Sequence, residues 1–505
     1  MLKGKIFDLE EADIPFVIDD TQRIIVTPPD NLAKWFSSDI VLTKNVRGVL
    51  SDGRPIRFFG CKYDGRHFSA QGYVYSHNNL IPDSLESFAI IRFTGQAIDN
   101  FSGGVSSAFD RENLEHVAGR MPGITPRPWD SITHRFESEI AGQHCRIEID
   151  NYLSYNLRWG ERQIGTCIPR FSISFPDLID VGYIPEIYLG VYDFFAFLNF
   201  RRCITFDSIA LYGQNQTGES YKTANVVIFS RHAETRRRDY FSSVTLDDLG
   251  NNLGSLFANI ASRRGREIFD DIFIPEDESD YSSVSHTSFL SCALSFEGEY
   301  DRTQPTKEET NNVFRDVKEI ACDAVISSTA TITGIPEADV RVLLIDGVER
   351  DINARITELA NGKSKTKREK IVSYAKKMLF ELRRVDFRLE EQFNNALKTY
   401  SAIIDPYREM LAARMEIDPQ ESKNLGQVFS GFRNQIGHGH PKPIERIHAY
   451  SFLIGRCLTY IMILKSAGLE DEQVGKILKK LFNIKYLSLN KKIQVITPTL
   501  LGEMI

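Results

Sequence analysis

Residues 245–260 read TLDDLGNNLGSLFANI, and this stretch separates two kinds of sequence pattern. Its apolar residues recur every three or four positions, as they do on one face of an α-helix. These residues are Leu246, Leu249, Leu253, Leu256, Phe257 and Ile260. Strand-like runs dominate before this stretch and are rare after it. We therefore predict an α+β multidomain protein, with a β-rich N-terminal domain over residues 1–240 and a helical region over residues 241–505.

The N-terminal region contains short strand-like runs at close intervals. Residues 47–59 predict a β-hairpin, in which Asp52-Gly53 suits a two-residue turn that needs positive φ. Such a series favours a β-sandwich or a partly closed barrel. The apolar run 187–200 fits a buried helix or a strand, because periodicity does not separate the two. The other predicted strands are residues 71–75, 88–93, 145–150, 170–175 and 225–230.

The C-terminal region has the apolar spacing of amphipathic helices. The predicted helices are residues 289–296, 311–328, 350–359, 370–384, 389–415, 444–466 and 474–482. The apolar run 450–464 is interrupted by Arg456 and is too short to span a bilayer, and the N-terminus lacks a signal-peptide core. These features predict a cytoplasmic protein without membrane contact.

Composition and charge limit the number of domains and the classes of function that the chain can have. A chain of 505 residues is too long for one core, so two or three domains are expected. The seven cysteines have no CxxC spacing, which argues against a zinc knuckle or a disulfide framework. The net charge of -7 argues against a protein that coats nucleic acid non-specifically. Residues 301–505 carry 32 basic and 27 acidic side chains, against 29 and 41 in residues 1–300, so the C-terminal part is the better partner for a polyanion.

The chemistry-bearing motif is residues 431–441, GFRNQIGHGHP. Arg433 can hold a phosphate oxygen and stabilise its charge, and His438 can exchange a proton near neutral pH. Attack of a ribose 2′-hydroxyl on its own phosphate needs only these functions and no metal, and it excludes DNA as substrate. Gly437 and Gly439 would allow a turn that brings His438 back beside Arg433.

The spacing of this pair carries little information by itself, because Arg111 and His116 repeat it in the β-rich region. Three further features distinguish Arg433 and His438. They lie in the helical region, Asn434 follows the arginine directly, and glycine and proline residues flank the pair at the end of a predicted helix.

The pattern Arg-Asn-x-x-x-His on a compact helical domain resembles the HEPN superfamily of nucleases. The layout resembles its ApeA-like branch, bacterial anti-phage (abortive infection) proteins with a β-rich domain ahead of HEPN. Residues 289–298, FLSCALSFEG, look like the early HEPN helix of that branch, in which a glutamate often follows such a run. The resemblance implies a HEPN core at about residues 285–505.

The resemblance also implies roles and partners. Arg433 would bind the scissile phosphate, His438 would be the acid and base, and Asn434 would orient both. Glu297 would support the site, for example in a salt bridge to Arg433. The implied protein is an endoribonuclease that cleaves RNA, tRNA among the candidates, without metal or cofactor. It would act as a homodimer or larger symmetric oligomer that answers a phage-derived trigger.

Other interpretations of these residues stay open. His438 can simply cap a helix C-terminus, where a cation is favourable. His438 and His440 can form a metal pair with Glu445, or His440 can replace His438 as the acid and base. A basic turn can contact RNA or be a solvated surface. Its residues are Lys363, Lys365, Lys367 and Arg368.

Two other function classes compete with the nuclease. The first is a non-catalytic HEPN module that binds RNA, a nucleotide or another protein. The second is a glycan-binding β-domain with a helical oligomerisation module.

Overall fold

The structure is a computed structural model, and the contacts reported below concern the residues that it describes. These are residues 2–7, 14–19, 24–26, 45–63, 68–77, 85–102, 109–111, 124–126, 134–154, 166–202, 204–214, 220–229, 243–263, 272–275, 284–303, 307–345, 371–372, 374–375, 378, 389–439 and 442–482. Two predicted segments, residues 350–359 and the basic turn 363–370, lie outside them.

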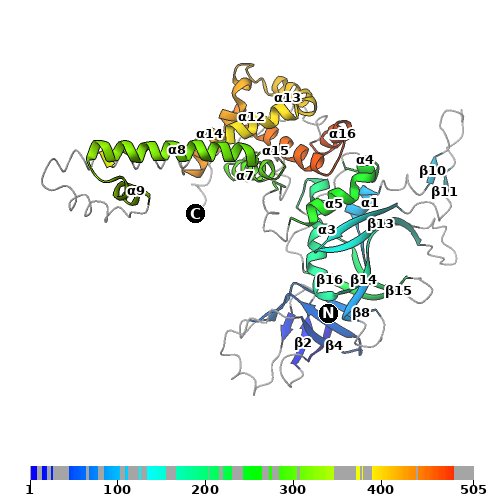
Figure 1. Ribbon diagram of the computed structural model, residues 1–505. Coiled ribbons are helices and arrows are strands. Elements are labelled where there is room, and N and C mark those ends of the chain that lie inside the picture. Colours follow the sequence, from blue (N-terminus) through cyan, green and yellow to red (C-terminus); the bar gives the residue numbers. More distant parts are fainter. Residues whose placement is uncertain are drawn as a thin grey trace, which may run out of the picture.

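One large antiparallel sheet forms the N-terminal half (Figure 1). Its twelve strands lie in the spatial order β12 (His134–Ile140), β13 (Gln143–Ser154), β14 (Thr166–Asp180), β9 (Ser87–Thr94), β15 (Ser208–Gln214), β16 (Ser220–Ile228), β8 (Gly72–Ser76), β5 (Pro55–Phe59), β4 (Val46–Leu50), β1 (Leu2–Ile6), β2 (Ile14–Ile18) and β3 (Ile24–Val26). Two small hairpins accompany it, β6 (Lys62–Tyr63) with β7 (Phe68–Ser69), and β10 (Phe109–Arg111) with β11 (Ile124–Pro126).

The predicted hairpin at residues 47–59 is confirmed as the antiparallel pair β4–β5. Its turn differs slightly from the expectation. The Leu50 N–H donates to the Arg54 carbonyl, so three residues close the loop, and Gly53 has φ +87°. An Asp at position 52 accepts from the Arg54 backbone N–H at 3.2 Å and so holds the turn.

The expectation of a two-sheet sandwich is wrong, because the main strands among the described residues form one continuous sheet, with β12 and β3 as its unpaired ends. The alternative of a partly closed barrel stays a prediction. The sheet still buries both faces near β5. Phe59 belongs to the main core cluster, whereas its neighbour Phe58 packs in a second cluster with Phe16 and Tyr73. Successive side chains of a strand point to opposite faces, so this sheet separates two cores.

Helices cover the face of the sheet that bears Phe171 and Ile173. They are α1 (Gln96–Phe101), α3 (Ile184–Asn199) and α5 (Leu253–Ala261), with 3₁₀ turns at Val181–Tyr183 and Gly250–Asn252. The ambiguous run 187–200 is therefore helical. Pro185 stands in the first turn of α3, where a missing N–H costs nothing, and Phe200 ends the helix with φ +50°. The short helix α4 (Leu246–Leu249) precedes α5 and contacts the helix at Asp471–Leu481.

The C-terminal half is helical, and the part of the chain that the structure describes there contains no strand. It consists of α7 (His286–Thr303), α8 (Lys307–Thr333), α9 (Glu337–Ile345), α12 (Leu389–Thr399), α13 (Ser401–Met415), α14 (Leu425–Gly437), α15 (Arg446–Ser466) and α16 (Asp471–Leu481), with a 3₁₀ turn at Glu421–Asn424. The predicted helix 389–415 is two helices that break at Tyr400. Figure 1 shows α8 extending away from the other helices, with α9 near its far end.

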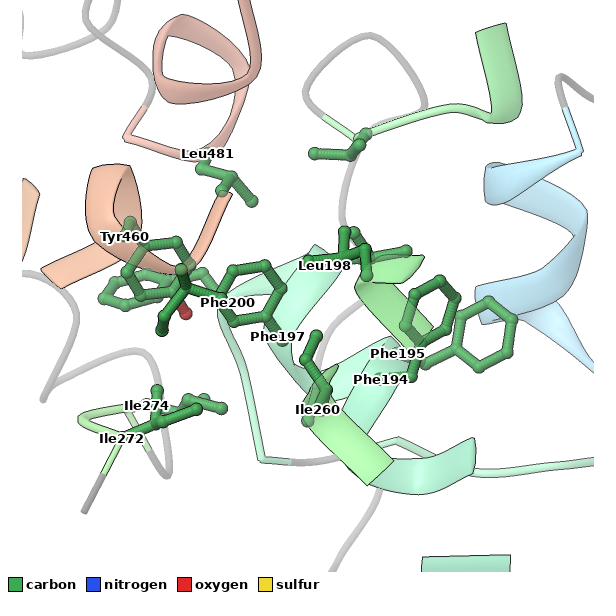
Figure 2. Packing of buried hydrophobic residues seen from close by; sticks show 14 of the residues in the cluster. Phe194, Phe195, Phe197, Leu198, Phe200, Ile260, Ile272, Ile274, Tyr460 and Leu481 are labelled. Carbon is green, nitrogen blue, oxygen red and sulfur yellow. The ribbon is translucent and has the colours of Figure 1, made fainter. Parts of the chain in front are cut away.

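The main hydrophobic core cluster runs through both halves. The ring of Phe197, at the end of α3, stacks on Tyr460 of α15 with centroids 4.4 Å apart, and both side chains are fully buried (Figure 2). Phe200 meets Tyr460 and Phe482 edge-on. The predicted boundary near residue 240 marks a change of secondary structure, and the core continues across it.

Among the described residues, two helical stretches are long and apolar enough to cross a membrane, residues 181–199 and 446–466. The apolar run 450–464 is too short to span a bilayer, but the helix that contains it, α15, has 21 residues, so the sequence-based prediction is wrong on length. Of the most apolar windows, 72% and 89% of the residues are buried inside the protein. Core helices meet the same criteria of length and apolar composition, so these helices give only weak evidence for a membrane.

Candidate functional site on α14

Helix α14 is fixed against the neighbouring helices by one aromatic face. Leu425, Phe429 and Phe432 are buried at helical spacing. Phe289 of α7 lies 5.2 Å from the Phe429 ring and 4.8 Å from the Phe432 ring, measured between centroids. This packing determines which side of α14 faces α7, and it leaves Arg433 beside that helix.

Arg433 forms an ion pair with Glu297 of α7. Its Nη2 lies 3.1 Å from Glu297 Oε2, and Nη1 donates to the Asn434 side-chain oxygen at 3.3 Å. The exposed fractions of the Arg433 and Glu297 side chains are 31% and 29%. Arg433 Nε is buried and has no hydrogen-bond acceptor among the described residues. The guanidinium is thus held by carboxylate and amide while part of it still faces solvent.

The pKa of Glu297 is raised from its ordinary value. Burial is the main cause, because the charged carboxylate loses hydration, and the negative charge of Asp301 acts in the same direction. The charge and hydrogen bond of Arg433 oppose the shift without reversing it. Glu297 therefore holds a proton more readily than an exposed glutamate does.

His438 lies at the C-terminal end of α14 and is exposed. Its backbone N–H donates to the Asn434 carbonyl at 3.0 Å, and Gly439, with φ +75°, ends the helix. The helix continues through Gly437, so the expected turn before His438 is wrong. Positions five apart on a helix diverge by roughly 140°, and accordingly no hydrogen bond or ion pair among the described residues joins Arg433 to His438.

Two further histidines lie beside this end of α14, and the sequence did not single them out. The His448 ring stacks on Phe432 with centroids 4.0 Å apart, and the His286 ring lies 5.8 Å from the same phenyl ring. His286 Nε2 is 2.9 Å from the Lys442 carbonyl oxygen, which ties the start of α7 to the chain that follows α14.

His448 also takes part in the capping of α15. The Glu445 backbone N–H donates to His448 Nδ1 at 3.1 Å. Burial lowers the pKa of His448 below its ordinary value, and the charges of Lys442 and His286 add to that effect, whereas Glu445 opposes it. The spacing of Glu445 and His448, which is that of a capping box, was the available sequence signal for this arrangement.

Of the remaining predicted site residues, the structure describes one and leaves the others outside the described ranges. Asn434 is exposed and contacts Arg433 as described above. His440 and the basic turn lie outside the described residues, as do any contacts they make. Within the described ranges, no three His, Cys, Asp or Glu side chains come together in a group that could hold a metal ion.

Comparison with known proteins does not assign the chain to a family. No protein-family model, no curated protein and no solved structure matches the chain.

Proposed function

We propose that the chain is a metal-independent endoribonuclease of the HEPN type. The placement of Arg433 carries the proposal. Glu297 and Asn434 hold its guanidinium, which is about one third exposed, near the end of α14, and the exposed imidazole of His438 follows at the end of the same helix. A guanidinium fixed in this way can bind a phosphate oxygen, and an exposed imidazole can exchange protons with solvent and substrate.

The proposed reaction is attack of a ribose 2′-oxygen on the adjacent phosphorus. The new bond joins O2′ to phosphorus, and the bond from phosphorus to the leaving O5′ breaks. One proton leaves the 2′-hydroxyl for a base, and one proton is given to O5′ by an acid. The products are a 2′,3′-cyclic phosphate and a 5′-hydroxyl. Arg433 stabilises the charge on the non-bridging oxygens, and His438 transfers protons.

The site is proposed to need two copies of the chain. In one copy, the side chains of Arg433 and His438 leave α14 in different directions and make no mutual contact among the described residues. A homodimer or larger symmetric oligomer can place His438 of one copy near Arg433 of another, since a twofold interface brings each surface against its equivalent.

The biological role is proposed from the HEPN and ApeA-like resemblance. An RNA-cleaving effector of this type stops growth by cutting host RNA, tRNA among the candidates, after a phage-derived trigger. The β-rich half is then the part that senses or restrains.

A second candidate is a non-catalytic HEPN module that binds RNA, a nucleotide or another protein. The neutralisation of Arg433 by Glu297 favours it, because an ion-paired arginine at a helix interface can be purely structural. In this case Arg433 and His438 support the fold and take part in no reaction.

Cleavage of RNA by the purified full chain tests the proposal. We expect wild type to produce 2′,3′-cyclic phosphate ends with or without EDTA, and to leave a strand with a 2′-deoxyribose at the cut site intact. His438→Ala should lower the rate by about 10²–10⁴-fold, and Arg433→Ala by about 10²–10³-fold.

Matched controls separate the site from general effects on a basic surface. Arg446→Ala removes an exposed arginine that pairs with Glu416, and His144→Ala removes an exposed histidine on β13. Both should cleave at the wild-type rate. Equal cleavage by wild type and His438→Ala, or loss of activity in EDTA, would contradict the proposed mechanism.

A further inference from the structure

Helix α7 carries acidic side chains that bind arginines on two different sides. Glu297 reaches Arg433 on α14, and Glu299, two residues later, reaches Arg263. Residues two apart on a helix differ in direction by roughly 200°, so these contacts fix the rotation of α7 from opposite faces. Both contacts therefore depend on the same rotation of α7.

The contact between Arg263 and Glu299 is two-pronged and buried. Arg263 Nη1 lies 2.6 Å from Glu299 Oε2, and Nη2 lies 3.2 Å from Oε1, with exposed side-chain fractions of 3% and 1%. Asn259 accepts from Arg263 through its side-chain oxygen at 2.7 Å. Burying such charges costs hydration energy, so a buried pair contributes more to defining the geometry than to stability.

Arg263 follows α5, which is built onto the sheet. The Ser138 hydroxyl of β12 donates to the Gly254 carbonyl at 2.9 Å. A Cβ at Gly254 would lie 2.2 Å from the Glu137 carbonyl oxygen, so only glycine permits this close approach. A displacement of β12 therefore moves α5, and with it Arg263.

We propose that the Arg263–Glu299 pair is a positioning contact, which sets how Glu297 holds Arg433 and thereby couples the sheet to the Arg433 site. The connection runs from Ser138 to Gly254 by a hydrogen bond, along α5 to Arg263, and from Arg263 by the ion pair to Glu299 on α7. The effect on the side chain of Arg433 is independent of any reaction. The effect on RNA cleavage rests on the proposed function.

Chemical modification of Arg433 tests the coupling. The full-length chain is treated with phenylglyoxal under native conditions, and the modification rate of Arg433 is followed by peptide mass spectrometry. Arg263→Met should raise this rate by about fivefold, because Glu297 no longer holds the guanidinium. Arg302→Met is the matched control, since Arg302 pairs with the same Glu299 carboxylate from within α7.

A rate for Arg263→Met that equals the rate for Arg302→Met, with native circular dichroism in both, overturns the proposal. If Arg263→Met fails to fold, Arg263→Lys is tested instead, because lysine keeps the charge and loses the two-pronged contact. A modification rate of Arg433 in Arg263→Lys that equals the wild-type rate then overturns the proposal. RNA cleavage is measured separately. A wild-type chain without ribonuclease activity overturns the proposed function and leaves the modification result to judge the coupling.

Discussion

Arg433 and Glu297 are 136 residues apart in sequence and 3.1 Å apart in space, where they join α14 to α7. The pair lies on the surface of the helical half, and each side chain is about one third exposed. The pKa of Glu297 is raised despite this ion pair. Burial and the charge of Asp301 therefore destabilise the ionised carboxylate more than Arg433 stabilises it.

Glu297→Gln should change the pH dependence of stability. A pKa above the ordinary 4.5 means that the folded protein binds the proton more tightly than the unfolded chain does. This contribution is complete below pH 4.5 and is lost as the pH rises through the folded-state pKa. Glutamine cannot ionise, so the variant does not lose this contribution. The free energy of unfolding of the variant, relative to that of wild type, should therefore increase as the pH rises to about 7.

Urea denaturation at a series of pH values measures this difference. Glu472→Gln is an opposite control, because the hydrogen bond and charge of Lys476 lower the pKa of Glu472. Its variant should lose stability relative to wild type above pH 4.5. A Glu297→Gln variant that instead loses stability with rising pH would show that Arg433 dominates the pair.

His448→Phe should remove an acid-sensitive part of the stability. Burial lowers the pKa of His448 below 6.5, so the neutral ring contributes stability that is present above pH 6.5 and lost as the pH falls through the lowered folded-state pKa. Phenylalanine keeps the stacking on Phe432 and has no charge to gain. The excess stability of wild type over the variant should shrink on acidification, as thermal melting at several pH values will show; a constant difference would contradict the assigned cause.

Local patterns in the sequence predicted much of the secondary structure. The spacing of Leu246, Leu253 and Phe257 indicated helices, and α4 and α5 lie there. The suggestion that Glu297 pairs with Arg433 also agrees with the geometry. The helical spacing depends on neighbours within a few turns, and a single sequence contains that information. The Glu297–Arg433 pair spans 136 residues, and its expectation came from the HEPN resemblance.

The sequence did not predict which segments distant in the chain lie side by side. The position of β9 between β14 and β15 joins segments distant in the chain, and no local signal encodes it. The same holds for His448, whose neighbour is Phe432 because two helices pack there. The direction of His438 was wrongly expected because glycine permits a turn without requiring one, and α14 continued through Gly437.

Four buried thiols should resist alkylation in the native protein. Burial raises the pKa of Cys61, Cys145 and Cys457 to about 12, and it raises that of Cys292 as well. The reactive thiolate is therefore scarce at neutral pH. Of the five cysteines whose side chains the structure describes, iodoacetamide with mass spectrometry should label the partly exposed Cys322 first, and the four buried thiols only after denaturation. Rapid native labelling of Cys292 would contradict the packing of α7 against α15.

Phe197→Ala should destabilise both halves of the molecule together. Phe197 is fully buried, and its ring stacks on Tyr460 in the core that joins the sheet side to the helices. Loss of a buried phenyl ring costs about 3–5 kcal/mol through lost burial and the cavity left behind. Because one core spans both halves, thermal unfolding followed by circular dichroism should stay a single transition and shift as a whole to lower temperature. Phe7→Ala, at an exposed position on the sheet side, should shift it much less. Two separate transitions, of which only one moves in Phe197→Ala, would mean that the halves fold as independent domains in spite of their shared core.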